Sequence, residues 1–365
     1  MIPERIYLDH AATTPLRPEA KAAMDEGFRL WANPSSPHAE GRKARSLLED
    51  ARERIKAALE WDGEVIFTSG ASEAAQVAFD GSQSTEGAFI STIEHSAIDL
   101  AAFENRKVPV LADGSINLFL LNKALIDDEL TPNALEVGVL DVAIQHINSE
   151  TGNRQNIKDI RTTIVADEDR LIVDCAQSAG KYPIPSEADM AIISAHKLGG
   201  PIGVGALLVR DFAQLDPSGG QERGYRRGTE NMPCVLGMAA ALEACTDPYV
   251  APEVLEPLDA LADECRKLGG TWLSDRLSDP TPYIRAIAMP NMSATAQVMR
   301  FDMAGIAVSQ GSACSSGTMK TSRVLEAMQV EPEVAANTIR VSLGWNTTRA
   351  EVERFCEVWL EMAKA

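Results

Sequence analysis

Short apolar runs alternate with amphipathic helical stretches over the first two thirds of this chain. The runs predict strands at 64–68, 88–92, 137–145, 171–173, 189–194 and 204–209, and the stretches between them predict helices at 42–59, 71–79 and 96–104. Such alternation is typical of an α/β fold, in which a mainly parallel sheet is covered by helices on both faces. The run at 204–209 follows its predecessor too closely for a crossover helix, which predicts one antiparallel hairpin.

The pattern changes after a helix predicted at 231–245, where Thr246-Asp247-Pro248 breaks the periodicity. Helices are predicted beyond it at 253–268, 294–303 and 349–364, with strands at 284–289, 306–308 and 338–343. We therefore expect an N-terminal arm at 1–14 that packs with the small domain, a large α/β domain at 15–246 and a small α+β domain at 247–365. The cleft between two such domains is a common ligand site.

Composition narrows the class of function. The chain has 365 residues and a formal net charge of -19, which disfavours nucleic acid and anionic membranes as partners. No apolar stretch reaches membrane-spanning length, and the N-terminus has no signal-peptide core. Six scattered cysteines without a C-x-x-C pair indicate a reduced, cytoplasmic protein with no metal site. A zinc deaminase is excluded because Pro233-Cys234 lacks the second cysteine of P-C-x-x-C.

One lysine, Lys197, is predicted to lie where water is scarce. The apolar run at 189–194 leads directly into Ser194-Ala195-His196-Lys197 and a glycine turn. Desolvation lowers the pKa of a lysine and leaves a neutral amine that can attack a carbonyl. The sequence is equally compatible with a phosphate-binding lysine, or with a strand-end lysine whose ammonium reaches solvent.

Three further strand ends carry polar groups that would converge with this lysine. Asp174 ends a buried strand and needs a partner, such as the pyridinium nitrogen of pyridoxal phosphate (PLP), while Gln177 can donate to a ring oxygen. His95 can lie against a cofactor ring and move a proton. The turn at 67–73 opens a helix where backbone N–H groups and Ser72 can bind phosphate. The alternatives are a helix-capping aspartate, a structural histidine and an ordinary helix start.

A single cysteine, Cys314, lies among small residues in GSACSSG at 311–317. Because the segment at about 309–320 has few apolar side chains to bury, it is predicted to be mobile and its thiol partly exposed. A thiol on such a loop can enter a cleft, react and leave. A hydrolase nucleophile is the alternative, but it needs a fixed histidine and an oxyanion hole, which a flexible loop does not suit.

Taken together, these motifs resemble the cysteine desulfurases of the NifS/IscS type, within the class V aminotransferase group of PLP enzymes. The resemblance runs nearly end to end, through YLDHAATTP (7–15), NPSSPHAEGRKAR (33–45), FTSGASEA (67–74), HINSETG (146–152), VDCAQSAGK (173–181), SAHKLGGPIGVGAL (194–207), ERGYRRGTEN (222–231), GSACSSG (311–317) and IRVSLGWNTT (339–348). It implies the PLP-dependent transferase fold type I, with a mostly parallel seven-stranded sheet in the large domain.

The resemblance also implies an activity and a set of roles. L-cysteine would give L-alanine and a persulfide on Cys314, passed to an acceptor for iron–sulfur cluster or thio-cofactor biosynthesis. Lys197 would join PLP as a Schiff base and then move the α-proton, and Arg340 would bind the substrate carboxylate, with Asn33 nearby. The implied cofactor-binding residues are Ala71, Ser72, His95, Ser149, Asp174, Gln177, Ser194, His196, Lys197 and Thr229. Because Thr229 would come from the partner subunit, a homodimer is implied.

The chain departs from the family pattern in two places. Ser149 replaces the second asparagine of the usual motif, which predicts slower turnover. The chain also ends seventeen residues after Thr348, where family members that dock a scaffold often carry a longer extension. The acceptor, an iron–sulfur scaffold or a sulfur carrier, therefore stays open. So do two other functions: another PLP enzyme of this group, such as an aminotransferase or selenocysteine lyase, and a weakly active partner in a sulfur-transfer complex.

Overall fold

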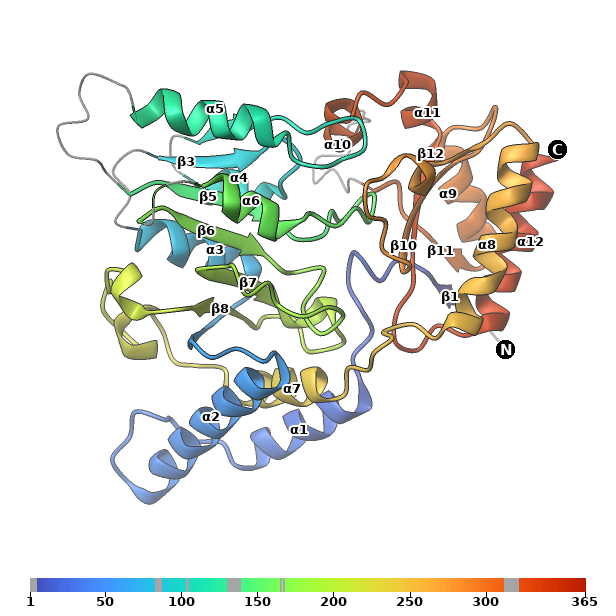
Figure 1. The fold of residues 1–365 in the computed structure, drawn as a ribbon. Coiled ribbons are helices and arrows are strands. Elements are labelled where there is room, and N and C mark those ends of the chain that lie inside the picture. Colours follow the sequence, from blue (N-terminus) through green and yellow to red (C-terminus); the bar gives the residue numbers. More distant parts are fainter. Residues whose placement is uncertain are drawn as a thin grey trace.

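The computed structural model describes residues 5–82, 87–102, 105–129, 139–164, 166, 168–311 and 322–365. Figure 1 shows two groups of elements side by side, a broad sheet flanked by helices and a smaller set of C-terminal elements. Cys314 lies outside the described residues, together with most of the segment 309–320. None of the helices in the described ranges is both long and apolar enough to cross a bilayer.

Seven strands form the large sheet, in the order β2-β8-β7-β6-β5-β3-β4. Their bounds are β2 Glu64–Thr68, β3 Ala88–Ser91, β4 Arg106–Val108, β5 Asp141–Gln145, β6 Arg170–Asp174, β7 Met190–Ser194 and β8 Gly205–Val209. β8 pairs antiparallel with β7 and β2, whereas the pairs from β7 to β4 are parallel. The predicted mostly parallel seven-stranded sheet and its hairpin are therefore confirmed.

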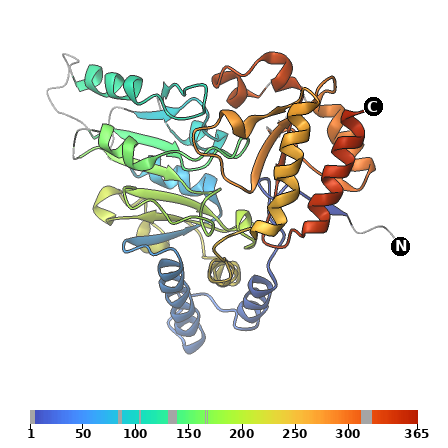
Figure 2. The same ribbon diagram turned by 45° about the vertical axis from the view of Figure 1, so that its right-hand side comes forward.

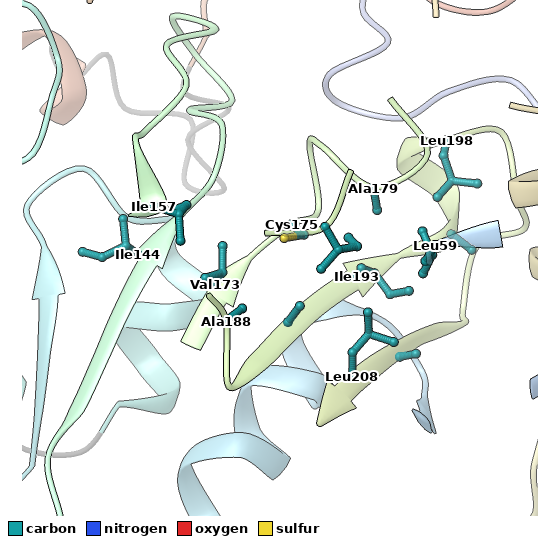
Figure 3. Packing of buried hydrophobic residues seen from close by; sticks show 14 of the residues in the cluster. Leu59, Ile144, Ile157, Val173, Cys175, Ala179, Ala188, Ile193, Leu198 and Leu208 are labelled. Atoms are coloured by element: carbon teal, nitrogen blue, oxygen red, sulfur yellow. The ribbon is translucent and has the colours of Figure 1, made fainter. Parts of the chain in front are cut away.

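Helices cover both faces of this sheet, because neighbouring side chains of a buried strand point to opposite sides. Ile172 and Ile192 pack in the cluster formed with α3 and α4, and Val173 and Ile193 pack in the cluster formed with α2, α5, α6 and α7. Figure 3 shows Val173, Ile193 and Leu208 in this second cluster. The helices are α2 Ala39–Ala58, α3 Ala71–Asp80, α4 Ser96–Ala101, α5 Leu118–Glu129, α6 Ile157–Thr163 and α7 Met232–Glu243. Figure 2 shows α7 end-on between α2 and α1 (Pro18–Arg29).

The C-terminal elements have a hydrophobic cluster of their own, in which Phe301 stacks on Phe355. A three-stranded antiparallel sheet has the order β12-β10-β9, and a two-stranded parallel sheet pairs β1 with β11. The bounds are β1 Ile6–Tyr7, β9 Thr271–Trp272, β10 Ile284–Ala288, β11 Ile306–Ala307, β12 Thr338–Ser342, α8 Pro252–Lys267, α9 Ala294–Met303, α10 Arg323–Ala327, α11 Pro332–Ala336 and α12 Arg349–Ala363. The first strand thus pairs with a late one, while the division into an arm and two domains stays a proposal.

Most predicted elements are present with small shifts of their ends. The strand predicted at 64–68 has the same bounds in β2, whereas the strand predicted at 137–145 begins at Asp141. The helix predicted at 96–104 ends at Ala101. Sequence reasoning missed α1, α5, α6, α10, α11 and the short strands β1, β4 and β9. The large sheet therefore places three polar strand ends, those of β5, β6 and β7, along one edge.

Candidate active site

The carboxyl ends of β6 and β7 bring Asp174 and Lys197 to one edge of the sheet, beside the end of β5. β6 ends at Asp174, and its neighbour β5 ends at Gln145. β7 ends at Ser194, after which a single 3-10 turn, Ala195–Lys197, carries the lysine. Because parallel strands run in the same direction, these three ends lie side by side, which is where ligands bind in open α/β sheets.

Lys197 is held at this edge by backbone oxygens from the start of the chain. Its Nζ donates to the carbonyl oxygens of Ala11 at 2.7 Å and Ala12 at 2.8 Å. Burial, together with the nearby Arg340 guanidinium, lowers the pKa of Lys197 to about 8. The side chain therefore has an appreciable neutral fraction near neutral pH, as a nucleophilic amine requires.

Asp174 is a half-buried carboxylate that interacts electrostatically with Lys197 and His95. Its Oδ1 accepts from the Ala176 N–H at 2.9 Å. Burial raises the pKa of Asp174, and the hydrogen bond from the Ala176 N–H and the charge of Lys197 act in the opposite direction. His95 is exposed and caps α4, with Nδ1 accepting from the Ala97 N–H at 3.1 Å. That bond places the ring proton of a neutral His95 on Nε2.

Glu94, next to His95, is a buried carboxyl that sequence reasoning missed. It is 2% exposed, and its Oε1 accepts from the Gln145 N–H at 2.9 Å. Burial, with a further contribution from the charge of Asp174, raises the pKa of Glu94 to about 8. The amide of Gln145 also donates to the Ile93 oxygen at 2.6 Å. This network fixes the turn that carries His95 to the end of β5.

The segment 9–13 contacts four of the predicted site residues, and sequence reasoning gave it no role. Besides the two bonds from Lys197, the Ala11 oxygen accepts from Gln177 Nε2 at 2.8 Å. Thr13 Oγ1 lies 3.1 Å from His196 Nδ1, and Asp9 pairs with Arg340 at 2.7 Å. The segment is irregular and its contacts span more than 160 residues, so no local periodicity identifies it.

The residues assigned to phosphate lie on adjoining strands. Gly205 pairs with Thr68 on one side and with Ser194 on the other, so the turn before α3 and the end of β7 are neighbours. A Cβ built on Gly205 would lie 2.8 Å from Gly70 Cα, whereas a Cβ on Gly70 would meet no atom within 4 Å. The first residues of α3, Ala71 and Ser72, therefore border open space at a helix N-terminus, where anions are stabilised.

Arg340 and Ser149 also meet at this site. The Arg340 side chain is nearly buried, and its Nη1 donates to the Ser149 oxygen at 2.9 Å. Its Nη2 pairs with Asp9 at 2.7 Å, while its Nε is buried and makes no hydrogen bond within the described part of the chain. That Nε–H leaves Arg340 a donor for an anionic ligand. A serine at 149 contributes its backbone oxygen here.

Two predicted site residues, Asn33 and Thr229, make no hydrogen bond to Lys197, Asp174 or Arg340 within the described part of the chain. Asn33 is exposed, its Oδ1 accepts from the Ser35 N–H at 2.9 Å, and Ser35 in turn reaches Gln221. Thr229 is exposed on the loop that also contains Gln221. On this loop, Arg226 donates to the Thr229 oxygen and to Glu73 of α3. No hydrogen bond among the described residues joins Asn33 to Lys197.

A separate surface cavity of about 650 Å³ contains none of the predicted site residues. Its lining includes His146, Arg154, Tyr182 and Asp279. It lies near the start of α6, whereas the cluster described above surrounds Lys197.

A parallel-stranded large sheet with a desolvated lysine beyond a strand end and an aspartate at the next strand end is typical of one class of PLP enzyme. The family model for aminotransferase class-V matches residues 6–355. The chain therefore belongs to the aminotransferase class-V family, whose members depend on PLP.

Within that family, the chain is similar to cysteine desulfurases. It is 33% identical to "Cysteine desulfurase IscS 1" of Archaeoglobus fulgidus, over 96% of this chain and 95% of that protein. A NifS-like protein from Rickettsia africae has a TM-score of 0.83 and 29% identity, with 99% of this chain and 100% of that one covered. The structure titled "SspA in complex with cysteine" has a TM-score of 0.77 and 27% identity, covering 94% and 100%. The resemblance predicted from the motifs is confirmed.

Proposed function

We propose that this protein is a PLP-dependent L-cysteine desulfurase that produces L-alanine and a persulfide on Cys314. The observation that carries the proposal is the convergence of Lys197, Asp174 and Arg340 at one sheet edge in a chain of this family. A lysine of lowered pKa, a carboxylate that needs a cation and an arginine with a free donor supply what an amino-acid substrate and its cofactor need.

The residues at the edge fit PLP. Asp174 is a carboxylate whose pKa is raised by burial, and a pyridinium nitrogen would keep it ionised. Gln177 Oε1 is buried and has no hydrogen-bond partner among the described residues, so its amide has capacity for a polar ring substituent. Ala71 and Ser72 begin a helix beside open space that a phosphate would fill. When bound, PLP supplies an electron sink for the bonds around the substrate Cα.

Each chain residue then has a task that follows from its surroundings. The neutral amine of Lys197 removes the α-proton of the substrate, because burial keeps its pKa at about 8. Arg340 binds the substrate carboxylate through its remaining N–H groups, and its ion pair with Asp9 holds the guanidinium in place. His95, fixed through Nδ1 to its own helix, presents Nε2 to the site.

Sulfur transfer itself needs a thiolate from this chain. The Cys314 thiolate attacks the sulfur of the substrate, an S–S bond forms, and the Cβ–S bond of the substrate breaks. The electron pair of the broken bond stays on the carbon, and a proton added there completes alanine. No external oxidant is required, because the carbon is reduced by the same electron pair that the transferred sulfur loses when it becomes part of the persulfide.

The proposal also includes the oligomeric state of the enzyme, its location and the protein that accepts the persulfide. Exposed Thr229, on a loop joined to α3 by the Arg226–Glu73 ion pair, supports a homodimer in which the loop serves the partner subunit. We assign a cytoplasmic location and an acceptor protein for the persulfide, either an iron–sulfur scaffold or a sulfur carrier. The net charge of -19 favours an acceptor with a basic docking surface.

One assay tests the activity. Purified protein is incubated with PLP and L-cysteine, and alanine and the mass of the Cys314 peptide are measured. We expect equal amounts of alanine and of protein-bound persulfide in a single turnover, and loss of both in Cys314→Ser. Retained sulfide release by Cys314→Ser would favour another PLP enzyme of this family. Absence of a borohydride-trapped link at Lys197 would favour an inactive partner protein.

A further inference from the structure

Arg17 is a buried arginine to which the proposed mechanism gives no task. It lies immediately before α1 and is 5% exposed. A guanidinium in such a place costs free energy unless its N–H groups find acceptors. The hydrogen bonds that its side chain makes within the described ranges go to backbone oxygens and to one thiol. The groups that it contacts therefore indicate what it holds in place.

Two of the contacts of Arg17 are with the turn that follows Lys197. Its Nε donates to the Leu198 oxygen at 3.0 Å, and its backbone N–H donates to the Gly199 oxygen at 2.8 Å. Gly199 has φ +92°, a left-handed conformation that favours glycine and turns the backbone sharply. Arg17 therefore fixes the two residues that come directly after the lysine.

The first half of this turn is held by the same N-terminal segment. The Thr14 N–H donates to the His196 oxygen at 2.8 Å, and Thr14 Oγ1 donates to the Lys197 oxygen at 3.2 Å. The carbonyl groups of four successive residues, 196–199, thus accept hydrogen bonds from Thr14 and Arg17. Because the ammonium of Lys197 is also bonded to this segment, both its backbone and its side chain depend on the same support.

The remaining contacts of Arg17 join the lysine turn to two other parts of the molecule. Its Nη1 donates at 2.9 Å to the oxygen of Ala244, which caps the C-terminal end of α7, where a positive charge is favourable. Its Nη2 lies 3.8 Å from Cys245 Sγ. Its guanidinium lies over the ring of Trp345, 5.1 Å from the centroid, and the indole Nε1 donates to the Pro15 oxygen at 3.0 Å. One planar group therefore ties the turn to α7 and to the loop after β12.

Burial links this support to the reactivity of Lys197. Five titratable or charged groups face the lysine, and they are Asp9, Asp174, Lys181, His196 and Arg340. Burial nevertheless makes the largest contribution to its lowered pKa of about 8. Burial depends on how firmly the turn is held, because water that reaches an ammonium stabilises its charge. Release of the turn from Arg17 would therefore raise the pKa of Lys197 toward that of an exposed lysine.

We propose that Arg17 is a positioning residue, which holds the turn after Lys197 and thereby keeps the Lys197 amine shielded from water and reactive toward a carbonyl. It does so through its bonds to Leu198, Gly199 and Ala244. The inference rests on the proposed function, since it concerns the lysine that attaches PLP and moves the α-proton.

The experiment measures the reactivity of Lys197 in the cofactor-free, full-length protein, so it does not depend on turnover. A trace of acetic anhydride acetylates neutral amines, and mass spectrometry compares the rate at Lys197 with that at exposed Lys364 as the pH is raised. In the wild type, the rate at Lys197 should rise with a midpoint at about pH 8. In Arg17→Ala we expect the midpoint to rise by about one pH unit, which lowers the rate at pH 7 by about tenfold. The plateau at high pH should stay within about twofold of wild type, because the neutral amine is the same group.

Three further variants serve as comparisons. Arg17→Met fills most of the same volume without any donor, so it should show the same rise of the midpoint even if Arg17→Ala does not fold. Arg29→Ala removes an exposed arginine of α1 and should give the wild-type profile. Arg170→Ala breaks a buried ion pair at the amino ends of the strands, and it should lower the stability without moving the midpoint.

Three results would overturn the inference. A wild-type midpoint in both Arg17→Ala and Arg17→Met would show that the bonds of Arg17 do not affect Lys197. An equal rise of the midpoint in Arg170→Ala would show that a loss of stability alone is responsible. A lower rate at every pH with an unchanged midpoint would show an effect on access of the reagent rather than on the amine.

The wild-type protein separates a failure of this inference from a failure of the proposed function. If wild-type Lys197 titrates at about pH 10, as an exposed lysine does, the lysine is not activated and the inference fails. If Lys197 titrates near pH 8 and responds to Arg17 as expected, but the PLP-loaded protein forms no alanine from L-cysteine, only the proposed function is contradicted.

Discussion

The polar residues at the two ends of strands β5 and β6 differ in how fully their hydrogen-bonding groups are paired. At the amino ends, Arg170 pairs with Asp141 at 2.8 Å, and Ser82 donates to the other Asp141 oxygen at 2.6 Å. Both ion-pair side chains are almost fully buried. At the carboxyl ends, Asp174 accepts one backbone N–H, and nearby Gln177 and Arg340 each keep a buried atom without a partner among the described residues.

This difference separates stability from function within one pair of strands. A buried ion pair whose atoms are all engaged has no capacity left for a ligand. Buried groups with an unused donor or acceptor cost free energy in the empty protein, and a ligand recovers that cost when it binds. We therefore expect substitutions at the amino ends to reduce stability, and substitutions at the carboxyl ends to reduce activity.

The largest effect is expected for Lys197→Ala at the carboxyl end. Turnover with L-cysteine should fall by about 10³-fold or more, within the range of a side chain that moves a proton. The melting temperature at pH 7 should not fall. Burial holds the folded-state pKa of Lys197 at about 8, below its unfolded value, so the charged lysine destabilises the fold below that pH, and this penalty disappears as the pH rises. A Lys197→Ala variant that loses stability and keeps activity would contradict the assignment of function to the carboxyl ends of the strands.

Arg170→Ala tests the amino ends of the strands, where we expect a loss of stability and little loss of activity. Removing one partner of a buried ion pair leaves Asp141 uncompensated and should lower the free energy of unfolding by about 3–5 kcal/mol. Urea denaturation measures this loss. The turnover of the remaining folded protein should stay within about twofold of wild type, because Arg170 lies at the far end of β6 from Asp174. A fall in turnover without a fall in stability would contradict the division between the two ends.

The pH dependence of PLP attachment sharpens the assignment of Lys197. Cofactor-free protein is mixed with PLP at different pH values, and the Lys197 label is trapped with borohydride and measured by mass spectrometry. Because the pKa of Lys197 is about 8, its neutral fraction should make the initial rate at pH 6 about 100-fold lower than the plateau above pH 8. Lys197→Arg should give no label at this position. A rate that is equal at pH 6 and pH 8 would show that the lowered pKa is irrelevant to attachment.

The smallest effect is expected for Ser149→Asn, which restores the usual residue of the family. One additional neutral hydrogen bond contributes about 1 kcal/mol, so kcat/KM for L-cysteine should rise by up to about fivefold. Ser149 gives its backbone oxygen to Arg340, and the longer side chain leaves that bond in place. A steady-state titration with cysteine measures the change. A decrease in kcat/KM would indicate that the serine suits this site better than asparagine.

The sequence predicted the parts of the site that regular elements position. Asp174 and Ser194 could be placed because fully buried strands read as continuous apolar runs, and a polar residue at the end of such a run is conspicuous. The residues around them could not be placed in the same way. Ala11 meets Lys197 across 186 residues, and Glu150 meets Ser322 across 172. Contacts made by irregular backbone have no periodicity from which to predict them.

The role of Cys314 remains a prediction, since it lies outside the described residues. The place of Asn33 near the substrate also remains a prediction, and its segment contacts the loop of Gln221 through Ser35. Sequence motifs identify residue types and their order, but they do not give the distance between two loops. The helix α1 was missed because it is packed mainly by alanine and glycine rather than by large apolar side chains.

The pairing of β1 with β11 has a consequence for folding. Residues 6–9 pair with Ile306, Ala307 and Ser342, which lie far along the chain. The backbone carbonyls that receive the Lys197 ammonium are therefore placed by a non-local closure, and such closure is slow. The vitamin-derived cofactor should consequently be captured late in folding, after these distant segments have met.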